Sequence, residues 1–218
     1  MPVETISYEA EIAQNGQLLR RIPHVHQHMM NEYERKVITI LAHKYNQENG
    51  IFEFGTWRGL TTHVLHCTSD PTQHIWTLDY IPPKDSSSFN PYQAAEVLPE
   101  SEIGMECKKD GNITQLLMDS MKFVAEEQGI SGIDFCLVDG NHTYEYVKHD
   151  AAEGMKMLRV GGVLVLHDYR ADIKPNAEQV HKGNMNTDHD GVCQFIIESH
   201  LNWKHIEKTN LIYTEKTD

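Results

Sequence analysis

A strand–helix–strand pattern over Ile133–Tyr169 restricts this chain to a small set of folds. Ile133–Val138 is a short apolar run between a glycine and Asp139, which is typical of a buried strand. Residues 144–159 carry apolar side chains about once per helical turn, and a Gly-Gly pair is expected to end that helix. Residues 163–166 are again all apolar. Two strands joined by a helix form a right-handed unit in which the strands are parallel, so the pattern predicts an α/β fold.

Polar side chains follow both predicted strands. Asp139 and His142 come after the first strand, and His167 and Asp168 come after the second. Because the carboxyl ends of parallel strands open on one edge of the sheet, these groups are expected to lie together where α/β sheets bind ligands. An Asp in such a place is also a common turn former or helix cap. Burying several polar groups at one edge costs free energy unless they bind a ligand or take part in catalysis. The four residues together therefore favour a metal or catalytic site.

A glycine turn follows an earlier predicted strand, Ile51–Phe54. The turn has the spacing E-x-G-x-x-x-G from Glu53 to Gly59, and a helix is expected to follow it. Glycines let a backbone approach a ligand closely, and a helix N-terminus presents free N–H groups. The spacing is neither the dinucleotide fingerprint nor a P-loop. Asp79 ends the next predicted strand, about 20 residues after the turn, where a carboxylate can accept both hydroxyls of a ribose. The two features together favour a nucleoside ligand.

The middle of the chain is predicted to hold one more strand and helix. Residues 103–107 are expected to form the strand and residues 114–128 the helix. Gly111 and Asn112 would then lie in the turn at the ligand edge, where an amide can recognise an adenine ring. Two strands near the C-terminus, residues 203–207 and 211–215, are expected to form a closing hairpin.

Two long irregular stretches, residues 80–101 and 170–190, interrupt these patterns. Long loops of this kind are either lids over a substrate or surface connections. Residues 1–30 form a polar N-terminal segment, which we interpret as a cap or a dimer arm of a homo-oligomer. The remainder, residues 31–218, is expected to be one domain.

Composition excludes some partners and suggests a compartment. The chain has 32 acidic and 19 basic residues, which argues against nucleic acid or an anionic membrane as a partner. The four cysteines show no CxxC pair and fit reduced thiols. The N-terminus lacks the pattern of a signal peptide, and no apolar run reaches membrane-spanning length. We therefore expect a cytoplasmic protein.

Several motifs in order resemble those of class I S-adenosylmethionine (SAM)-dependent methyltransferases. The motifs are EFGTWRG, TLDY, VDGNHTYEYVKHD and LRVGGVLVLHDY, and the resemblance runs from about Asn31 to the C-terminus. Within that superfamily the chain is similar to the metal-dependent small-molecule O-methyltransferases that act on sugars and macrolides. The resemblance implies a Rossmann-like, doubly wound, mostly parallel sheet of seven strands with an antiparallel strand from the C-terminal hairpin.

The resemblance also implies how the cofactor is held. The positions that shape the pocket for its methionine part are Glu53, Gly55, Thr56 and Gly59. Asp79 would hold the ribose, and Gly111 and Asn112 would lie beside the adenine.

Asp139, His167 and Asp168 match the metal-ligand positions of the same family. Magnesium prefers hard oxygen ligands, so His167 either stays outside the coordination shell or favours manganese, iron or zinc. Some relatives carry an acidic general base where this chain has Asn141, and an amide cannot take a proton. His142 is therefore the substitute candidate for the base, acting beside Asp139.

The sequence thus predicts a SAM-dependent methyltransferase that uses a divalent metal, Mg²⁺ or Mn²⁺, to methylate a hydroxyl of a small molecule. One alternative is a metal-independent N- or C-methyltransferase with the same fold. Others are a metal-dependent hydrolase and a non-catalytic nucleoside-binding domain.

Overall fold

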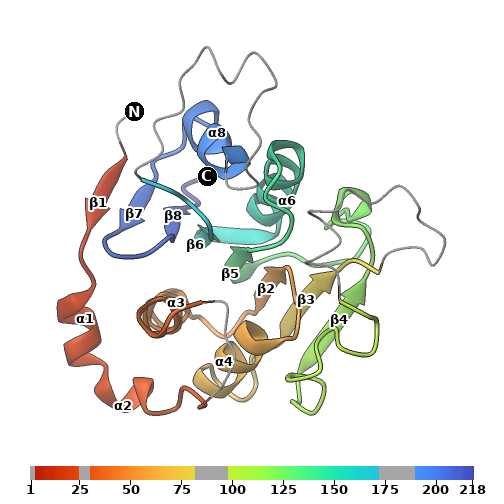
Figure 1. The fold of residues 1–218 in the computed structure, drawn as a ribbon, viewed down its shortest axis with the longest axis horizontal. Coiled ribbons are helices and arrows are strands. Elements are labelled where there is room, and N and C mark those ends of the chain that lie inside the picture. Colours follow the sequence, from red (N-terminus) through yellow and green to blue (C-terminus); the bar gives the residue numbers. More distant parts are fainter. Residues whose placement is uncertain (1–2, 25–29, 82–97, 172–189) are drawn as a thin grey trace.

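A single eight-stranded sheet forms the centre of the molecule (Figure 1). The computed structural model describes residues 3–24, 30–81, 98–171 and 190–218. The strands are β1 (Glu4–Ile6), β2 (Ile51–Phe54), β3 (Ile75–Asp79), β4 (Ile113–Leu117), β5 (Ile133–Val138), β6 (Leu158–Leu166), β7 (Lys204–Ile206) and β8 (Ile212–Glu215). The helices are α1 (Glu9–Gln14), α2 (Gly16–Leu19), α3 (Glu32–Tyr45), α4 (Leu60–Thr68), the 3₁₀ turn η1 (Ser120–Lys122), α6 (Tyr144–Met157) and α8 (Asp190–Glu198).

The strand order is β1-β7-β8-β6-β5-β2-β3-β4. Strand β8 runs antiparallel to both of its neighbours, β6 and β7, and the other described pairs are parallel. This confirms the mostly parallel, doubly wound sheet with an antiparallel strand from the C-terminal hairpin. The predicted count of seven strands was one too low for the described residues. The N-terminal segment contributes β1, which adds to the sheet edge beside β7.

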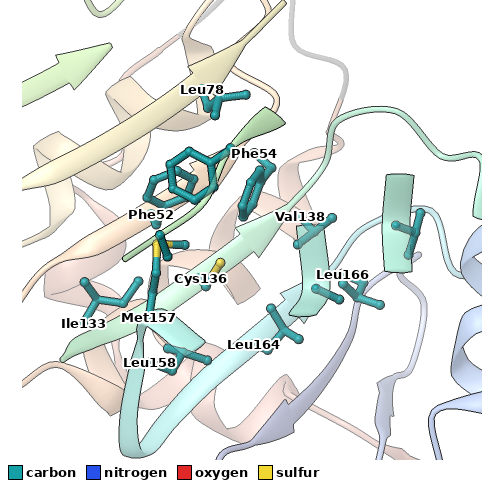
Figure 2. Packing of buried hydrophobic residues seen from close by; sticks show 14 of the residues in the cluster. Phe52, Phe54, Leu78, Ile133, Cys136, Val138, Met157, Leu158, Leu164 and Leu166 are labelled. Carbon is teal, nitrogen blue, oxygen red and sulfur yellow. The ribbon is translucent and has the colours of Figure 1, made fainter. Parts of the chain in front are cut away.

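Helices cover both faces of the sheet, with α3 and α4 on one side and α6 and α8 on the other (Figure 1). Alternation along the strands produces the two cores. In β5, Phe135 and Leu137 pack into the core on the α3 side, whereas Cys136 and Val138 belong to the opposite core. Figure 2 shows this second core, where Cys136 and Val138 lie near the phenylalanines of β2. Strands buried on both faces explain why the sequence reads as continuous apolar runs.

A capping box starts α3, as the spacing of Asn31 and Glu34 predicts. The Asn31 side chain accepts a hydrogen bond from the Glu34 N–H at 3.0 Å, and the Glu34 carboxylate accepts one from the Asn31 N–H at 3.0 Å. These bonds satisfy two N–H groups that the first helical turn leaves without partners.

A buried carboxylate ties the amino-terminal edge of the sheet together. Asp134, at the start of β5, is 0% exposed. It accepts hydrogen bonds from the N–H of Gln47 (2.8 Å), from the N–H (2.9 Å) and the side chain (3.0 Å) of Asn49, and from Arg159 Nε (2.6 Å). Burial opposes this charge, but the hydrogen bonds outweigh it and lower the pKa of Asp134. The loop before β2 is thereby fixed to β5 and β6.

Three local predictions were wrong. Residues 103–107 form turns, and the expected helix over 114–128 is replaced by β4 (Ile113–Leu117), followed by η1. The apolar positions Leu117 and Met121, spaced as on a helix, are both exposed and build no core. The Gly-Gly pair does not end a helix either, because α6 stops at Met157 and both glycines lie within β6.

No helix of the described residues is both long enough and apolar enough to cross a bilayer. The two irregular stretches predicted at 80–101 and 170–190 lie mostly outside the described residues, so their assignment as substrate loops stays a prediction.

Candidate active site

Four strand ends meet at the carboxyl edge of the sheet and bring the predicted site residues together. The backbone N–H of Gly55, after β2, donates to the Leu78 carbonyl of β3 at 2.8 Å. The Asp139 N–H, after β5, donates to the Phe54 carbonyl at 2.9 Å. The His167 N–H, after β6, donates to the Val138 carbonyl at 3.0 Å. The residues that follow β2, β3, β5 and β6 therefore share one edge.

The first glycine of the turn is required by close packing. Gly55 has φ +97°, a conformation that side chains rarely adopt. A Cβ built on it would lie 2.1 Å from the Asp139 carbonyl oxygen, so only glycine fits. Gly59 also has a left-handed backbone, with φ +82°, and forms the N-cap of α4. The backbone of the glycine turn therefore packs directly against Asp139, the site residue that follows β5.

Glu53 is a buried carboxylate with one oxygen left for a ligand. It is 1% exposed, and its Oε2 accepts hydrogen bonds from the hydroxyls of Thr62 and, at 2.7 Å, Thr77. Its Oε1 is buried and has no hydrogen-bond partner among the described residues. Burial raises the pKa of Glu53 to about 8, although the two threonine bonds act in the opposite direction. A ligand ammonium group would satisfy this oxygen and restore the charge.

The carboxylate of Asp79 lies at the end of β3, beside the glycine turn. Its Oδ2 accepts a hydrogen bond from the Trp57 N–H, and its Oδ1 accepts one from the Tyr80 N–H at 2.7 Å. Burial raises the pKa of Asp79 despite both bonds. Thr56 is buried in the same turn, and its Oγ1 lies 2.7 Å from Thr77 Oγ1. The carboxylate oxygens keep lone pairs that a diol can use.

Gly111 and Asn112 do not lie at this edge, contrary to the prediction. They precede β4, whose first residue, Ile113, pairs with the first residue of β3. The Asn112 side chain donates to the Pro71 carbonyl, at the opposite end of the sheet. The error follows from the missed strand. Residues 111 and 112 were expected after the carboxyl end of a strand, but they lie before the amino end of the strand over 113–117.

Residues 118–120 occupy the place that was assigned to Gly111 and Asn112. The Met118 N–H donates to the Asp79 carbonyl oxygen at 2.9 Å, which puts the end of β4 beside the end of β3. Asp119 follows, and its side chain caps η1 by accepting from the Met121 N–H at 3.1 Å. The signal was present in the sequence as an apolar stretch that ends in an Asp, the pattern that identified Asp79 and Asp139.

Two histidines and two aspartates form a cluster at the ends of β5 and β6. His142 Nε2 lies 2.9 Å from Asp168 Oδ2 and 3.8 Å from Asp139 Oδ1. His167 Nδ1 lies 2.9 Å from Asp168 Oδ2 and 3.1 Å from Asp139 Oδ1. The two imidazoles thus approach the same pair of carboxylates.

The mutual attraction in this cluster controls its protonation. Burial opposes a charge on His142, but the bonds to Asp139 and Asp168 outweigh it and raise the pKa of His142 to about 10. The same balance raises the pKa of His167 well above its usual value. Burial favours neutral carboxyls, yet the histidines lower the pKa of both Asp139 and Asp168. Without a bound cation, this attraction favours ionised aspartates and protonated histidines.

The donor set fits a divalent transition metal. Asp139, His142 and Asp168 each offer one ligand atom, and these atoms lie within 4.8 Å of one another. Two carboxylates with an imidazole suit manganese, iron or zinc. His167 is more deeply buried and reaches the two aspartates from the side of α3. The sequence identified these four residues, but it assigned the ligand role to His167 and the base role to His142.

Glu34 is a neighbour of the cluster that the sequence analysis did not include in the site. Its Oε1 lies 3.7 Å from His167 Nε2 and accepts a hydrogen bond from the Asn210 N–H at 2.9 Å. Burial opposes its charge, but His167 and the Asn210 N–H keep the pKa of Glu34 below its usual value. Asn141, by contrast, has a local role, because its side chain accepts from the Thr143 N–H at 2.9 Å.

Comparison with solved structures supports the reading of the fold. The O-methyltransferase TomG from Streptomyces achromogenes, in complex with SAM, superimposes with a TM-score of 0.57 at 14% identity, over 95% of this chain and 89% of TomG. An O-methyltransferase from Bacillus cereus, in complex with S-adenosylhomocysteine (SAH), gives 0.55 at 15% identity, over 95% and 91%. MycE, a mycinamycin-pathway methyltransferase in complex with Mg, SAH and mycinamycin VI, gives 0.55 at 15% identity, over 92% of this chain and 54% of MycE.

Sequence comparison places the chain in a family. A search of curated protein sequences gives no match. The model of the methyltransferase-domain family, however, matches residues 52–169, more than half of the chain. The matched region starts in β2 and ends just after Asp168, so it includes the glycine turn, Asp79 and the Asp–His cluster. The chain belongs to the methyltransferase-domain family.

Proposed function

We propose that the protein transfers a methyl group from SAM to a hydroxyl of a small molecule, with a divalent metal ion holding the acceptor. Family membership supports methyl transfer. The observation that carries the rest is the cluster of Asp139, His142 and Asp168 at the ends of β5 and β6, on the edge that also holds Glu53 and Asp79. A metal site beside a cofactor pocket can bring donor and acceptor together.

The chain's polar groups match the parts of SAM along this edge. The buried, unpartnered Oε1 of Glu53 would accept from the ammonium of the methionine part. Asp79 would accept from the ribose hydroxyls. Residues 118–120, which follow β4 next to Asp79, would flank the adenine in place of Gly111 and Asn112. Gly55 and Gly59 have positive φ and shape the backbone turn that would lie against the ligand.

The metal would be held by Asp139, His142 and Asp168, with His167 fixing the two carboxylates from behind. When bound, a divalent ion lowers the pKa of an acceptor hydroxyl and fixes its direction. An imidazole among the ligands favours manganese over magnesium. His142 cannot coordinate a metal and accept a proton through the same Nε2. We assign it the ligand role because its side chain is more exposed than that of His167, 17% against 9%, and because its ligand atom groups with those of Asp139 and Asp168. The rigid strand ends then align the acceptor oxygen with the methyl carbon.

Calorimetric titration tests the proposal. SAM is titrated into the metal-free protein, and then Mn²⁺ and Mg²⁺ are titrated separately. We expect SAM binding that is weakened in Asp79→Ala, and Mn²⁺ binding that is lost in Asp168→Ala while SAM affinity is retained. Absence of SAM binding would favour the nucleoside-binding or hydrolase alternatives. Loss of SAM affinity in Asp168→Ala would place that residue in the cofactor pocket.

A metal-independent methyltransferase is the second candidate, and one observation favours it. The two histidines already neutralise the two aspartates, so the cluster is paired without an ion. In that case a chelator would leave turnover unchanged. Under the first proposal, the chelator abolishes turnover and added Mn²⁺ restores it.

A further inference from the structure

The burial and the contacts of Glu34 exceed what the capping of α3 requires. The glutamate of a capping box needs only to reach the N-cap backbone, and such residues commonly remain in water. Glu34 is instead only 4% exposed, and its two oxygens meet three partners from separate parts of the chain. Oε2 accepts from the Asn31 N–H at 3.0 Å. Oε1 accepts from the Asn210 N–H at 2.9 Å and lies 3.7 Å from His167 Nε2.

The two ring nitrogens of His167 face different partners. Its Nδ1 faces Asp139 and Asp168 at 3.1 and 2.9 Å. Its Nε2 is buried and has no hydrogen bond among the described residues, and it points toward Glu34. A carboxylate on the far side of the ring attracts the second N–H of a protonated imidazole and helps to fix the plane of the ring. Glu34 is therefore placed to orient His167 as its Nδ1 faces the two aspartates.

The backbone around Asp168 is held by the same group of residues. Asp168 has φ +61°, a left-handed conformation that is strained for a non-glycine residue. The next residue, Tyr169, donates its N–H to the Asn210 carbonyl at 2.9 Å. Asn210 in turn donates its own N–H to Glu34. Glu34 thus supports Asp168 by two routes, through His167 and through the turn between β7 and β8.

We propose that Glu34 is a positioning residue for the metal site, which fixes His167 and the backbone of Asp168 so that Asp139 and Asp168 are held ready for an ion. The inference rests on the proposed function, since it concerns the same site. The family model matches residues 52–169, so Glu34 lies outside the matched segment. The inference therefore adds the start of α3 to the site.

The test compares three variants by Mn²⁺ calorimetry and urea unfolding. Glu34→Gln removes the charge and keeps the shape. Asn31→Ala breaks the same capping box without touching His167. Glu32→Gln makes the same chemical change in the same helical turn, at an exposed residue whose ion pair within the described part of the chain is with Lys36. We expect Glu34→Gln to weaken Mn²⁺ binding by about 10- to 100-fold. Asn31→Ala should lower stability yet keep Mn²⁺ affinity within about twofold, and Glu32→Gln should change neither.

Two results would overturn the inference alone. Either Glu34→Gln binds Mn²⁺ like the wild type, or Asn31→Ala weakens Mn²⁺ binding as much as Glu34→Gln does. In the second case the effect would be structural. Failure of the wild type to bind Mn²⁺ would instead overturn the metal part of the proposed function, and the inference with it. If Glu34→Gln yields too little folded protein, Glu34→Asp replaces it, because the shorter side chain withdraws from His167 and is judged by the same two outcomes.

Discussion

The unpartnered oxygen of Glu53 gives the sharpest test of the cofactor pocket. Glu53→Gln keeps the shape of the side chain and removes the charge that would face the ligand ammonium. A hydrogen bond to a charged group contributes about 1.5–3 kcal/mol. Because about 1.4 kcal/mol corresponds to a tenfold change in Kd, the substitution should weaken SAH binding by about 10- to 100-fold.

A matched ligand isolates this contact. 5′-Methylthioadenosine has the adenine, ribose and sulfur of SAH but lacks the amino acid, so its affinity should not change in Glu53→Gln. Both ligands are titrated calorimetrically into both proteins. If SAH affinity changes by less than about twofold, or if the two ligands lose affinity equally, Glu53 does not bind the ammonium.

The pH dependence of binding follows from the same residue. The ligand-free pKa of Glu53 is about 8, and only the ionised form pairs with an ammonium. Below pH 8 the carboxyl must lose a proton on binding, and a 10- to 100-fold effect of the charge limits the fall in wild-type SAH affinity between pH 8 and pH 6 to about 5- to 25-fold. Glu53→Gln should show a flat profile over this range. Since the folded pKa is raised, the carboxyl's contribution to stability is lost as pH rises from about 4.5 to 8, and ligand-free Glu53→Gln should be more stable than the wild type at pH 8.

Other residues give predictions that urea unfolding can check. Asp134→Asn should lower the free energy of unfolding by about 3 kcal/mol. The reason is that a buried carboxylate with four hydrogen-bond donors is replaced by an amide, which has only one acceptor oxygen. A loss below about 1 kcal/mol would contradict this. As the pKa of Asp134 is lowered, its contribution should be present at neutral pH and disappear in acid. Gly55→Ala should cost about 3 kcal/mol or more and weaken SAH binding, since its Cβ would overlap Asp139. Gly111→Ala is its control, because nothing lies within 4 Å of the added Cβ. An effect of Gly111→Ala on SAH affinity would return that residue to the cofactor site.

The sequence predicted the parts of the site that follow well-marked strands. Asp79, Asp139 and Asp168 each end or follow an apolar run bounded by turn residues, and the parallel sheet brings those ends together. The prediction failed at β4, an edge strand that is only half-buried, where the apolar spacing imitates a helix. Four of its five residues are partly buried to a similar degree, so its sequence, ITQLL, lacks the apolar–polar alternation that identifies a strand.

The role of Glu34 could not have been read from the sequence. Its local pattern is fully explained as a capping box, and its partners His167 and Asn210 come from distant parts of the chain. The choice between His142 and His167 as a ligand also depends on side-chain direction. Both histidines lie close to the strand ends in the sequence, and only the geometry shows that His142 is the more exposed of the two and that His167 is backed by Glu34.

The contact between Gly55 and the Asp139 carbonyl leaves no room for the two halves of the site to move independently. A displacement of the glycine turn would push directly on the backbone that carries Asp139. Under the proposed function, the sheet would therefore set the distance over which the methyl group travels, whichever molecule accepts it. Acceptor preference could then change from one relative to another while the spacing between donor and acceptor stayed the same.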